Sequence, residues 1–180
     1  GPCLEKDPHI FIGSVASQGY VPQIMTAARA TNEGLEEHTA ERVLGFLRSR
    51  SKSPQDARVF ISGLAFKGRP ETGDLRGSSA CNVVRILQNA GIKNIFGHDF
   101  IALSEDILRL GVTPCSFEEG FHGADCFLLM NNHKNYEKID IVSFLPFMKN
   151  PAFFFDGWHM FDPRVIKTYP HITYEGLGSA

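Results

Sequence analysis

The first seven residues contain a cysteine, a lysine and an aspartate at a spacing that could support nucleophilic chemistry. In the opening sequence GPCLEKD, Lys6 and Asp7 follow Cys3 by three and four residues. Residues three and four apart share one face of a helical turn. A nearby ammonium favours the thiolate, which is the nucleophilic form of cysteine, and a carboxylate can transfer a proton or orient a water molecule. The alternative is a frayed terminus with an idle cysteine.

A second group of candidate residues lies in the loop after the first predicted strand. Residues 63–78, GLAFKGRPETGDLRGS, carry Lys67, Arg69 and Arg76 among glycines and lead into a predicted helix. Cations at such a position suit an anionic phosphate group. The loop is not a Walker phosphate loop, because Arg-Pro follows its second glycine, and it contains no GxGxxG fingerprint. The alternative is a solvated basic loop in which Asp74 pairs with Arg76.

The remaining cysteines and histidines do not predict a metal site or disulfides. The seven histidines show no metal-ligand spacing, and the four cysteines form no CxxC pair. Cys81, Cys115 and Cys126 lie within apolar patterns and are predicted to be small core residues. DGWH, at residues 156–159, follows a predicted buried strand, a position that favours a ligand-binding loop, although its tryptophan could equally serve core packing.

A long amphipathic helix is predicted to position the first group. Apolar residues recur with a period near 3.6 across residues 21–50. A helix of about 28 residues is about 40 Å long. One interpretation is a spine that links two domains and packs against a second subunit, and the other is two shorter helices with a bend at Gly34. Residues 1–20 are predicted to form a loop that runs into a short helical piece.

An alternating strand and helix pattern is predicted to position the second group. It begins after the polar linker SKSPQ at residues 51–55, which divides the chain into residues 1–55 and 56–180. The predicted strands are residues 58–64, 94–99, 112–115, 125–130, 152–156 and 171–174, and the predicted helices are residues 78–90, 103–110, 117–121, 139–147 and 163–167. This alternation predicts an α/β fold in which the long helix precedes a doubly wound, Rossmann-like parallel sheet. Ligands bind such sheets at the carboxyl ends of the strands.

The composition is that of an ordinary globular protein. The chain has 180 residues, of which 43% are hydrophobic and 21% charged. A net charge of −2 gives no electrostatic reason to expect nucleic acid as a partner. We expect no membrane association and a cytoplasmic location, because the sequence shows neither a long apolar run nor a signal-peptide pattern. The chain opens inside a motif and without methionine, which favours a fragment of a longer protein.

Four features in this order resemble the UDP-glucose/GDP-mannose dehydrogenase family, which includes the UDP-N-acetylhexosamine dehydrogenases. They are GPCLEKD, the long helix containing Asn32, the loop GLAFKGRPETGDLRGS and the late DG turn. The resemblance covers essentially the whole chain but only the last two-fifths of a typical member. It implies oxidation of the C6 alcohol of a nucleotide sugar to a carboxylate in two hydride transfers to NAD. It also implies a homodimer formed through residues 21–50 and a role in making polysaccharide or envelope precursors.

The resemblance assigns roles to the residues around the cysteine. Cys3 would hold the substrate as a thiohemiacetal and then as a thioester. Asp7 would help to activate the hydrolytic water, and Lys6 would lie near the cofactor or in the charge network of the active site. Gly1 and Pro2 would end the loop that wraps the substrate.

The same resemblance assigns roles in the second unit, and two departures from the family pattern concern the substrate. Phe66 and Lys67 correspond to UDP-sugar contacts, and Arg76 to the arginine that reaches NAD across the domain cleft. Trp158 stands where members with a DGR motif have arginine, which removes one expected substrate contact. Pro2, in place of glycine, favours the UDP-N-acetylhexosamine branch.

Two other classes of function remain open. The first is a nucleotide-sugar-binding module without catalysis. The second is a cysteine hydrolase using Cys3 and a histidine, although no sequence signature brings a histidine to the thiol. The NAD-binding domain would lie upstream of this chain, so residues 1–180 alone are not expected to turn over substrate.

Overall fold

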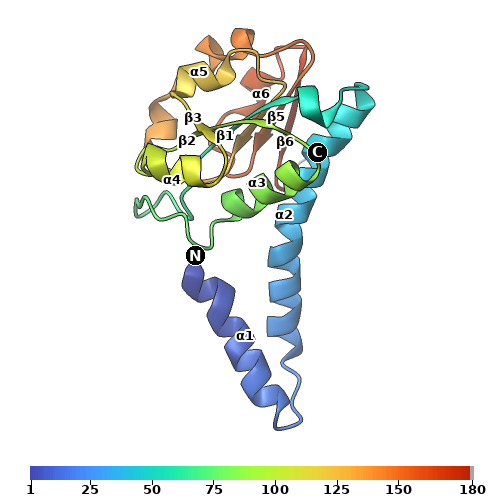
Figure 1. Ribbon diagram of the computed structural model, residues 1–180, viewed down its shortest axis with the longest axis vertical. Coiled ribbons are helices and arrows are strands. Elements are labelled where there is room, and N and C mark those ends of the chain that lie inside the picture. The colour runs from blue at the N-terminus through green and yellow to red at the C-terminus, as the bar shows by residue number, and fades with distance from the viewer. Residues whose placement is uncertain (179–180) are drawn as a thin grey trace.

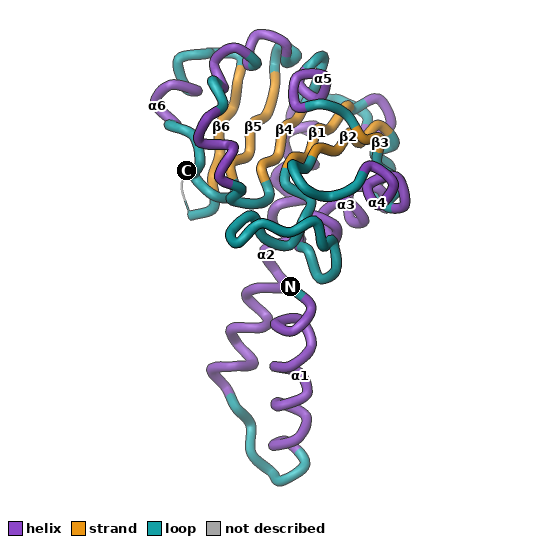
Figure 2. The backbone as a smooth tube through the Cα atoms, turned by 90° about the vertical axis from the view of Figure 1, so that its left-hand side faces the viewer, coloured by secondary structure: helices purple, strands orange, loops and turns teal. Residues whose placement is uncertain are grey.

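The computed structural model describes residues 1–178. Figure 1 shows an α/β domain from which two helices project as a hairpin. These helices are α1 (Pro2–Ala16) and α2 (Gln23–Ser49). The first half of α2 runs beside α1, and the second half lies against the domain, as Figure 2 also shows. The chain therefore starts at the base of the hairpin, close to the domain.

The long helix is confirmed as a single element of 27 residues. Gly34 causes no break, so the alternative with two shorter helices is wrong. In its second half, Ala40, Val43 and Leu47 are fully buried in the domain core. Burial of this apolar face stabilises the helix far more than the two interior glycines weaken it. One rigid element thus joins the hairpin to the domain.

The prediction of a loop for the beginning of the chain is wrong, because Pro2–Ala16 form a helix. Proline is tolerated in the first turn of a helix, but Pro8 lies inside α1 and has no N–H to donate to the carbonyl oxygen of Leu4. Arg29 Nη1 on α2 donates to that oxygen instead, at 3.0 Å. A contact between residues 25 positions apart therefore supports a helix that the local sequence does not favour.

The predicted α/β sheet is confirmed: six strands lie in the order β3-β2-β1-β4-β5-β6, and all neighbouring pairs are parallel. The strands are β1 (Arg58–Ser62), β2 (Asn94–His98), β3 (Thr113–Pro114), β4 (Cys126–Leu129), β5 (Ala152–Asp156) and β6 (Ile172–Gly176). Both β4 and β5 are buried along their whole length, as expected for parallel strands covered on both faces. The strand order reverses between β1 and β4, where ligands of such sheets bind.

The two faces of the sheet carry different cores, because successive side chains of a strand point to opposite faces. On one face, α2 and α3 (Ser79–Asn89) cover Val59 and Ile61. On the other face, Phe60, Phe127 and Phe154 belong to an aromatic core. The remaining helices are α4 (Ser104–Arg109), α5 (Phe117–Phe121) and α6 (Pro163–Ile166), with short 3-10 helices η1 (Pro54–Asp56), η2 (Lys134–Lys138), η3 (Ile141–Ser143) and η4 (Leu145–Phe147).

The predicted helix at residues 139–147 is wrong in kind. The structure has the two short 3-10 helices η3 and η4 there. Pro146 lacks the N–H that an α-helix would use, and a proline disfavours helical geometry in the residue before it.

Within residues 1–178, no helix is both long and apolar enough to cross a membrane. The same residues contain no cluster of side chains suited to hold a metal ion.

Candidate functional site

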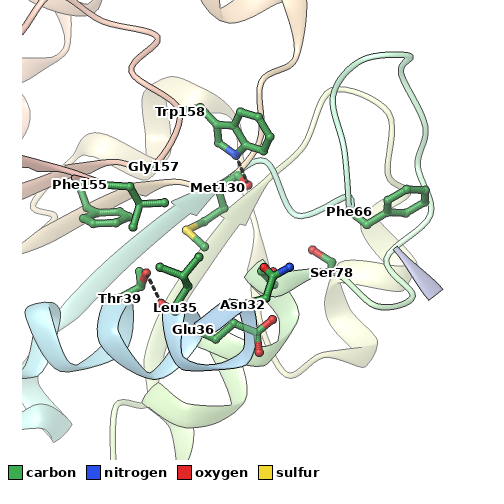
Figure 3. Close-up of a pocket in the computed structure, with 12 residues that line it drawn as sticks. Asn32, Leu35, Glu36, Thr39, Phe66, Ser78, Met130, Phe155, Gly157 and Trp158 are labelled. Carbon is green, nitrogen blue, oxygen red and sulfur yellow. Dashed lines mark hydrogen bonds between the residues drawn. The ribbon is translucent and has the colours of Figure 1, made fainter. Parts of the chain in front are cut away.

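Two adjoining cavities lie between the helical hairpin and the carboxyl ends of the strands. The hairpin cavity, of about 630 Å³, is lined by Gly1 and Leu4 of the first segment, by α2 and by α3. The sheet cavity, of about 310 Å³, lies against Met130 and Phe155 at the ends of β4 and β5 (Figure 3). The residues common to both linings are Asn32, Glu36, Phe66, Ser79 and Trp158. The two cavities therefore form one cleft.

The two candidate segments meet at Gly1 and Phe66. A Cβ atom placed on Gly1 would lie 2.7 Å from Phe66 Cε2, so any larger residue would displace the ring. Lys67 Nζ lies 5.2 Å from the centre of the same ring. Chain segments that are separated by more than sixty residues thus share one wall of the cleft.

The reactive groups themselves lie outside both cavities. Cys3 is exposed, and the exposed side chains of Lys6 and Asp7 approach each other to 3.6 Å between Nζ and Oδ1. The α1 residues that line the hairpin cavity are Leu4, Glu5 and His9, which share a different face of the helix from Cys3 and Asp7. Lys67 and Arg76 are likewise absent from both linings. The structure brings the segments together without placing the thiol and the lysine in these cavities.

The loop that carries Phe66 and Lys67 is fastened by residues that follow β2 and β4. Asp99 Oδ2 accepts a hydrogen bond from the backbone N–H of Ala65, at 2.9 Å. Asn132 Oδ1 accepts one from Gly68 N, at 3.2 Å. Further along the loop, Arg69 pairs with Glu137, and Glu71 pairs with His133 and Lys134. These contacts hold the loop in place at the carboxyl edge of the sheet.

Arg76 is strongly exposed and pairs with Asp74 inside the DLRG turn. The guanidinium donates to both carboxylate oxygens, with Nη2 2.7 Å from Oδ2. This arginine holds the pKa of the Asp74 carboxyl down at about 2. The ion pair between Asp74 and Arg76, which the sequence analysis gave as the alternative, is therefore present. Arg76 nevertheless stays accessible to a ligand from solvent.

Arg29 and Glu33 link α1 to α2, and the sequence analysis overlooked both. Besides its bond to Leu4, Arg29 donates to Glu33 Oε1 at 2.9 Å, and His9 Nε2 lies 2.8 Å from the same oxygen. The hydrogen bond from Arg29, followed by that from His9, lowers the pKa of Glu33. The four-residue spacing of Arg29 and Glu33, together with the unpaired carbonyl that Pro8 predicts, could have revealed this cluster.

Trp158 forms part of the wall of both cavities and is 47% exposed. Its Nε1 donates to the backbone oxygen of Met130, at 3.0 Å (Figure 3). Asp156 Oδ1 accepts from Trp158 N, and its Oδ2 accepts from Phe161 N. Burial raises the pKa of Asp156. Of the two interpretations of the DGWH turn, this geometry favours the ligand-binding loop.

A doubly wound parallel sheet with an open cleft at its carboxyl edge places the chain in the class of open α/β domains, which bind their ligands at that edge. Within that class, residues 60–163 match the family described as "UDP-glucose/GDP-mannose dehydrogenase family, UDP binding domain". The chain belongs to this family, as the sequence resemblance indicated.

Curated relatives extend well beyond the length of this chain. UDP-N-acetyl-D-glucosamine 6-dehydrogenase of Pseudomonas aeruginosa is 26% identical over 140 residues, which are 77% of this chain and 32% of that protein. UDP-glucose 6-dehydrogenase AglM of Haloferax volcanii is 37% identical over 102 residues, 57% of this chain and 22% of that protein. UDP-glucose 6-dehydrogenase TuaD of Bacillus subtilis is 25% identical over 99% of this chain and 37% of its own length. The matches thus span between 22% and 37% of the length of these three relatives.

Solved structures share the fold of the whole chain, hairpin included. The UDP-D-ManNAc dehydrogenase of Pyrococcus horikoshii superposes with a TM-score of 0.79 at 24% identity, covering 99% of this chain and 38% of that one. A UDP-glucose dehydrogenase from Pyrobaculum islandicum gives a TM-score of 0.76 at 24% identity, and the match covers 100% of this chain and 38% of that one. The projecting hairpin is therefore part of a fold that occurs within longer chains.

Proposed function

We propose that this chain is the C-terminal part of an NAD-dependent nucleotide-sugar 6-dehydrogenase and that its cleft binds a UDP-sugar. The packing of Gly1 against Phe66 carries the proposal, because it joins the cysteine segment to the anchored loop of a domain in the UDP-binding family. Relatives that are named as UDP-sugar 6-dehydrogenases support the reaction. Residues 56–180 form the sugar-nucleotide domain, and residues 1–55 supply the cysteine and the dimer helix.

The substrate contacts follow from the shape of the cleft. The Phe66 ring and the Gly1 backbone form one wall, against which the sugar ring packs. Lys67, which is partly buried beside Phe66, provides the positive charge for the diphosphate. Because Asp99 and Asn132 hold this loop from the domain side, the contacts are formed before the ligand arrives.

Cys3 carries the covalent chemistry. After the C6 alcohol has become an aldehyde, the thiol adds to its carbon and the thiol proton passes to the carbonyl oxygen. The thiohemiacetal loses a hydride from its carbon and the proton of its hydroxyl group, which gives a thioester. Water then attacks the thioester carbon, the C–S bond breaks, and the sulfur takes up a proton, which restores the thiol. Asp7 accepts a proton from that water, and Lys6 beside it belongs to the same charge network.

When bound, NAD would supply the oxidising equivalents as the hydride acceptor. This chain contains no GxGxxG fingerprint, so we place most of the NAD site on a preceding domain. Arg76 is the residue of this chain that suits a cofactor contact, because its guanidinium is exposed while Asp74 fixes its direction. Cys3, Lys6 and Asp7 are also exposed, as residues facing another domain would be.

The proposal also includes a homodimer formed through α2. We place the protein in the cytoplasm. The hairpin exposes large apolar side chains that the domain does not cover. Those more than half exposed are Leu4, Ile10, Tyr20, Val21 and Ile24. Large apolar side chains left exposed on one projecting element suit an interface with a second subunit. A monomeric mass in light scattering at high concentration would contradict the dimer.

Two experiments test the function. UDP at millimolar concentration should raise the melting temperature of this chain, because a ligand that binds the folded state alone stabilises it. In the longer protein that contains the NAD domain, Cys3→Ser should abolish release of the uronic acid, whereas the control Cys115→Ser should not. The thiol's position outside both cavities favours one alternative, a nucleotide-sugar-binding module without catalysis. Normal turnover by Cys3→Ser would remove this thiol from the mechanism.

A further inference from the structure

We infer that Arg29 is a positioning residue for Cys3: it fixes the rotation of α1 on α2 and thereby the direction in which the thiol points. This inference rests on the proposed function and deepens it, because it adds a residue that acts on the cysteine from another helix. It follows from three properties of the hairpin, which are the weak apolar packing of α1, the bonds that Arg29 makes and the attachment of α2 to the domain.

Apolar packing does not by itself fix the rotation of α1. Figure 2 shows α1 beside the first half of α2, away from the core of the domain. Of its described side chains, none is fully buried, and Pro8, Ile12 and Val15 are the ones that are half-buried. These three form a narrow stripe, so rotation of the helix about its axis would lose little apolar contact. Because successive residues of a helix are about 100° apart around its axis, a modest rotation changes what Cys3 faces.

Two polar contacts in the first half of α1 supply the missing constraint. Arg29 Nη1 donates to the carbonyl oxygen of Leu4, the residue after the thiol, at 3.0 Å. Arg29 Nη2 donates to Glu33 Oε1 at 2.9 Å, and His9 Nε2 lies 2.8 Å from the same oxygen. The Leu4 carbonyl group and the His9 ring are therefore both tied to one guanidinium–carboxylate pair on α2.

Directional bonding explains an arginine at this position better than stability does. The Arg29 side chain is 14% exposed, and its Nε is buried and has no hydrogen-bond partner among the described residues. An apolar side chain would fill the same space between the helices without an unsatisfied polar atom. It could not donate to the carbonyl oxygen that Pro8 leaves without an N–H. Arg29 thus determines where the first turn of α1 lies.

The guanidinium is fixed relative to the cleft, because α2 is a single helix rooted in the domain. The same 27-residue helix that carries Arg29 buries Ala40, Val43 and Leu47 in the core. The first turn of α1 is thus placed by Arg29 from one side and by the packing of Gly1 in the cleft from the other. In the proposed reaction the thiol must reach C6 of the sugar, and a small misplacement of a reacting group slows such a step strongly.

Energy transfer from Trp158 to an acceptor on Cys3 measures the position of the thiol. Trp158 is the single tryptophan of the chain, and its indole is hydrogen-bonded to the backbone of the domain. Cys3 is exposed, whereas Cys81 and Cys126 are buried, so an aminonaphthalene iodoacetamide should label Cys3 selectively. Cys115→Ser removes the remaining, partly exposed thiol. The decay of the tryptophan emission then gives the distribution of donor–acceptor distances.

Variants separate positioning from folding. Arg29→Met keeps the length of the side chain but removes its donors, so it should broaden the distance distribution while leaving the urea midpoint unchanged or higher. Arg29→Lys, which can still donate to the Leu4 carbonyl oxygen, should restore part of the wild-type distribution. Arg42→Gln is the matched control, because Arg42 lies on the same helix but pairs with Glu175 of β6, and it should change nothing.

The longer protein that contains the NAD domain tests the consequence for the reaction. Its substrates would be UDP-glucose, UDP-N-acetylglucosamine and UDP-N-acetylmannosamine, followed in single turnovers. The first hydride transfer of the proposed reaction does not need the thiol, whereas the second follows its addition. Arg29→Met should therefore keep the rate of the first transfer and slow the second by about tenfold to a hundredfold. Arg29→Lys should recover part of this loss.

The outcomes distinguish this inference from the proposed function. The same distance distribution in Arg29→Met as in the wild type would overturn the inference and leave UDP-sugar binding intact. Equal slowing of both hydride transfers, or a normal second transfer, would overturn it as well, because neither reports a displaced thiol. Failure of the wild-type longer protein to oxidise any of the three UDP-sugars would overturn the proposed function together with the inference, whatever the distances show.

Discussion

Gly68→Ala should disrupt the loop that carries Phe66 and Lys67. Gly68 is buried, and a Cβ atom built on it lies 2.1 Å from the backbone N of His133 and 2.5 Å from the carbonyl carbon of Asn132. Ordinary contacts of a Cβ atom begin near 3.4 Å. The two loops must therefore move apart by about 1.3 Å, the difference between 3.4 and 2.1 Å, to admit the methyl group.

The magnitude follows from the atoms that obstruct the methyl group. They are backbone atoms, so rotation of a side chain cannot make room. Overpacking of this kind costs about 1–3 kcal/mol. The movement also breaks the hydrogen bond from Gly68 N to Asn132 Oδ1 and weakens that from Arg69 Nε to Asn132 O, each with a net value of about 0.5–1.5 kcal/mol. We expect the free energy of unfolding to fall by about 2–4 kcal/mol.

Urea unfolding with Gly34→Ala as the control measures this effect. A Cβ atom on Gly34 meets nothing within 4 Å, and the residue lies in the middle of α2. Alanine there should stabilise the chain by about 0.5–1 kcal/mol. Gly68→Ala should also weaken UDP binding, because the displaced loop carries Lys67. A stability within about 0.5 kcal/mol of wild type, with unchanged UDP affinity, would refute the steric reasoning.

Three further predictions concern the hairpin, the half-buried His98 and the thiols. Arg29→Gln should speed amide hydrogen exchange in α1, because it leaves the carbonyl oxygen of Leu4 without its donor, and Arg29→Lys should partly restore protection; unchanged exchange would contradict this role. Burial lowers the pKa of His98 below its ordinary value of 6.5. As the pH falls through 6.5, this histidine therefore takes up a proton in the unfolded chain before it does so in the folded chain, and the free energy of unfolding decreases. His98→Gln should reduce the decline in the urea midpoint between about pH 7.5 and 5.5, and an identical decline would show that other groups cause it. At about pH 8, iodoacetamide should modify Cys3 first by mass spectrometry, because burial raises the pKa of Cys115 to about 11; earlier modification of Cys115 would contradict the observed exposures.

Elements with a strong local signal could be predicted from the sequence. The continuous apolar runs at β4 and β5 predict buried parallel strands, and the structure buries every residue in them. The long run of apolar residues with a period near 3.6 across residues 21–50 predicts helix, and the structure shows that this helix, α2, is a single one. In these segments the local pattern and the tertiary environment agree.

Elements that depend on distant contacts could not be predicted in this way. Pro8 argues locally against α1, and the helix is supported by an arginine on another helix. The cleft has the same origin, since Gly1, Phe66 and Trp158 come together only through the fold. The motif spacing identified the segments around Cys3 and Lys67. It could not show that neighbours of these residues, rather than the thiol and the ammonium, line the cavities.

Amide chemical-shift mapping with UDP-N-acetylglucosamine tests the central claim most directly. The claim is that the cleft between the hairpin and the carboxyl ends of β1, β4 and β5 binds the nucleotide sugar. It predicts the largest shifts in residues 64–68, 157–159 and 30–36, with little change in residues 117–122 on the other face of the sheet. Shifts confined to that other face, or no shifts at saturating ligand, would contradict it.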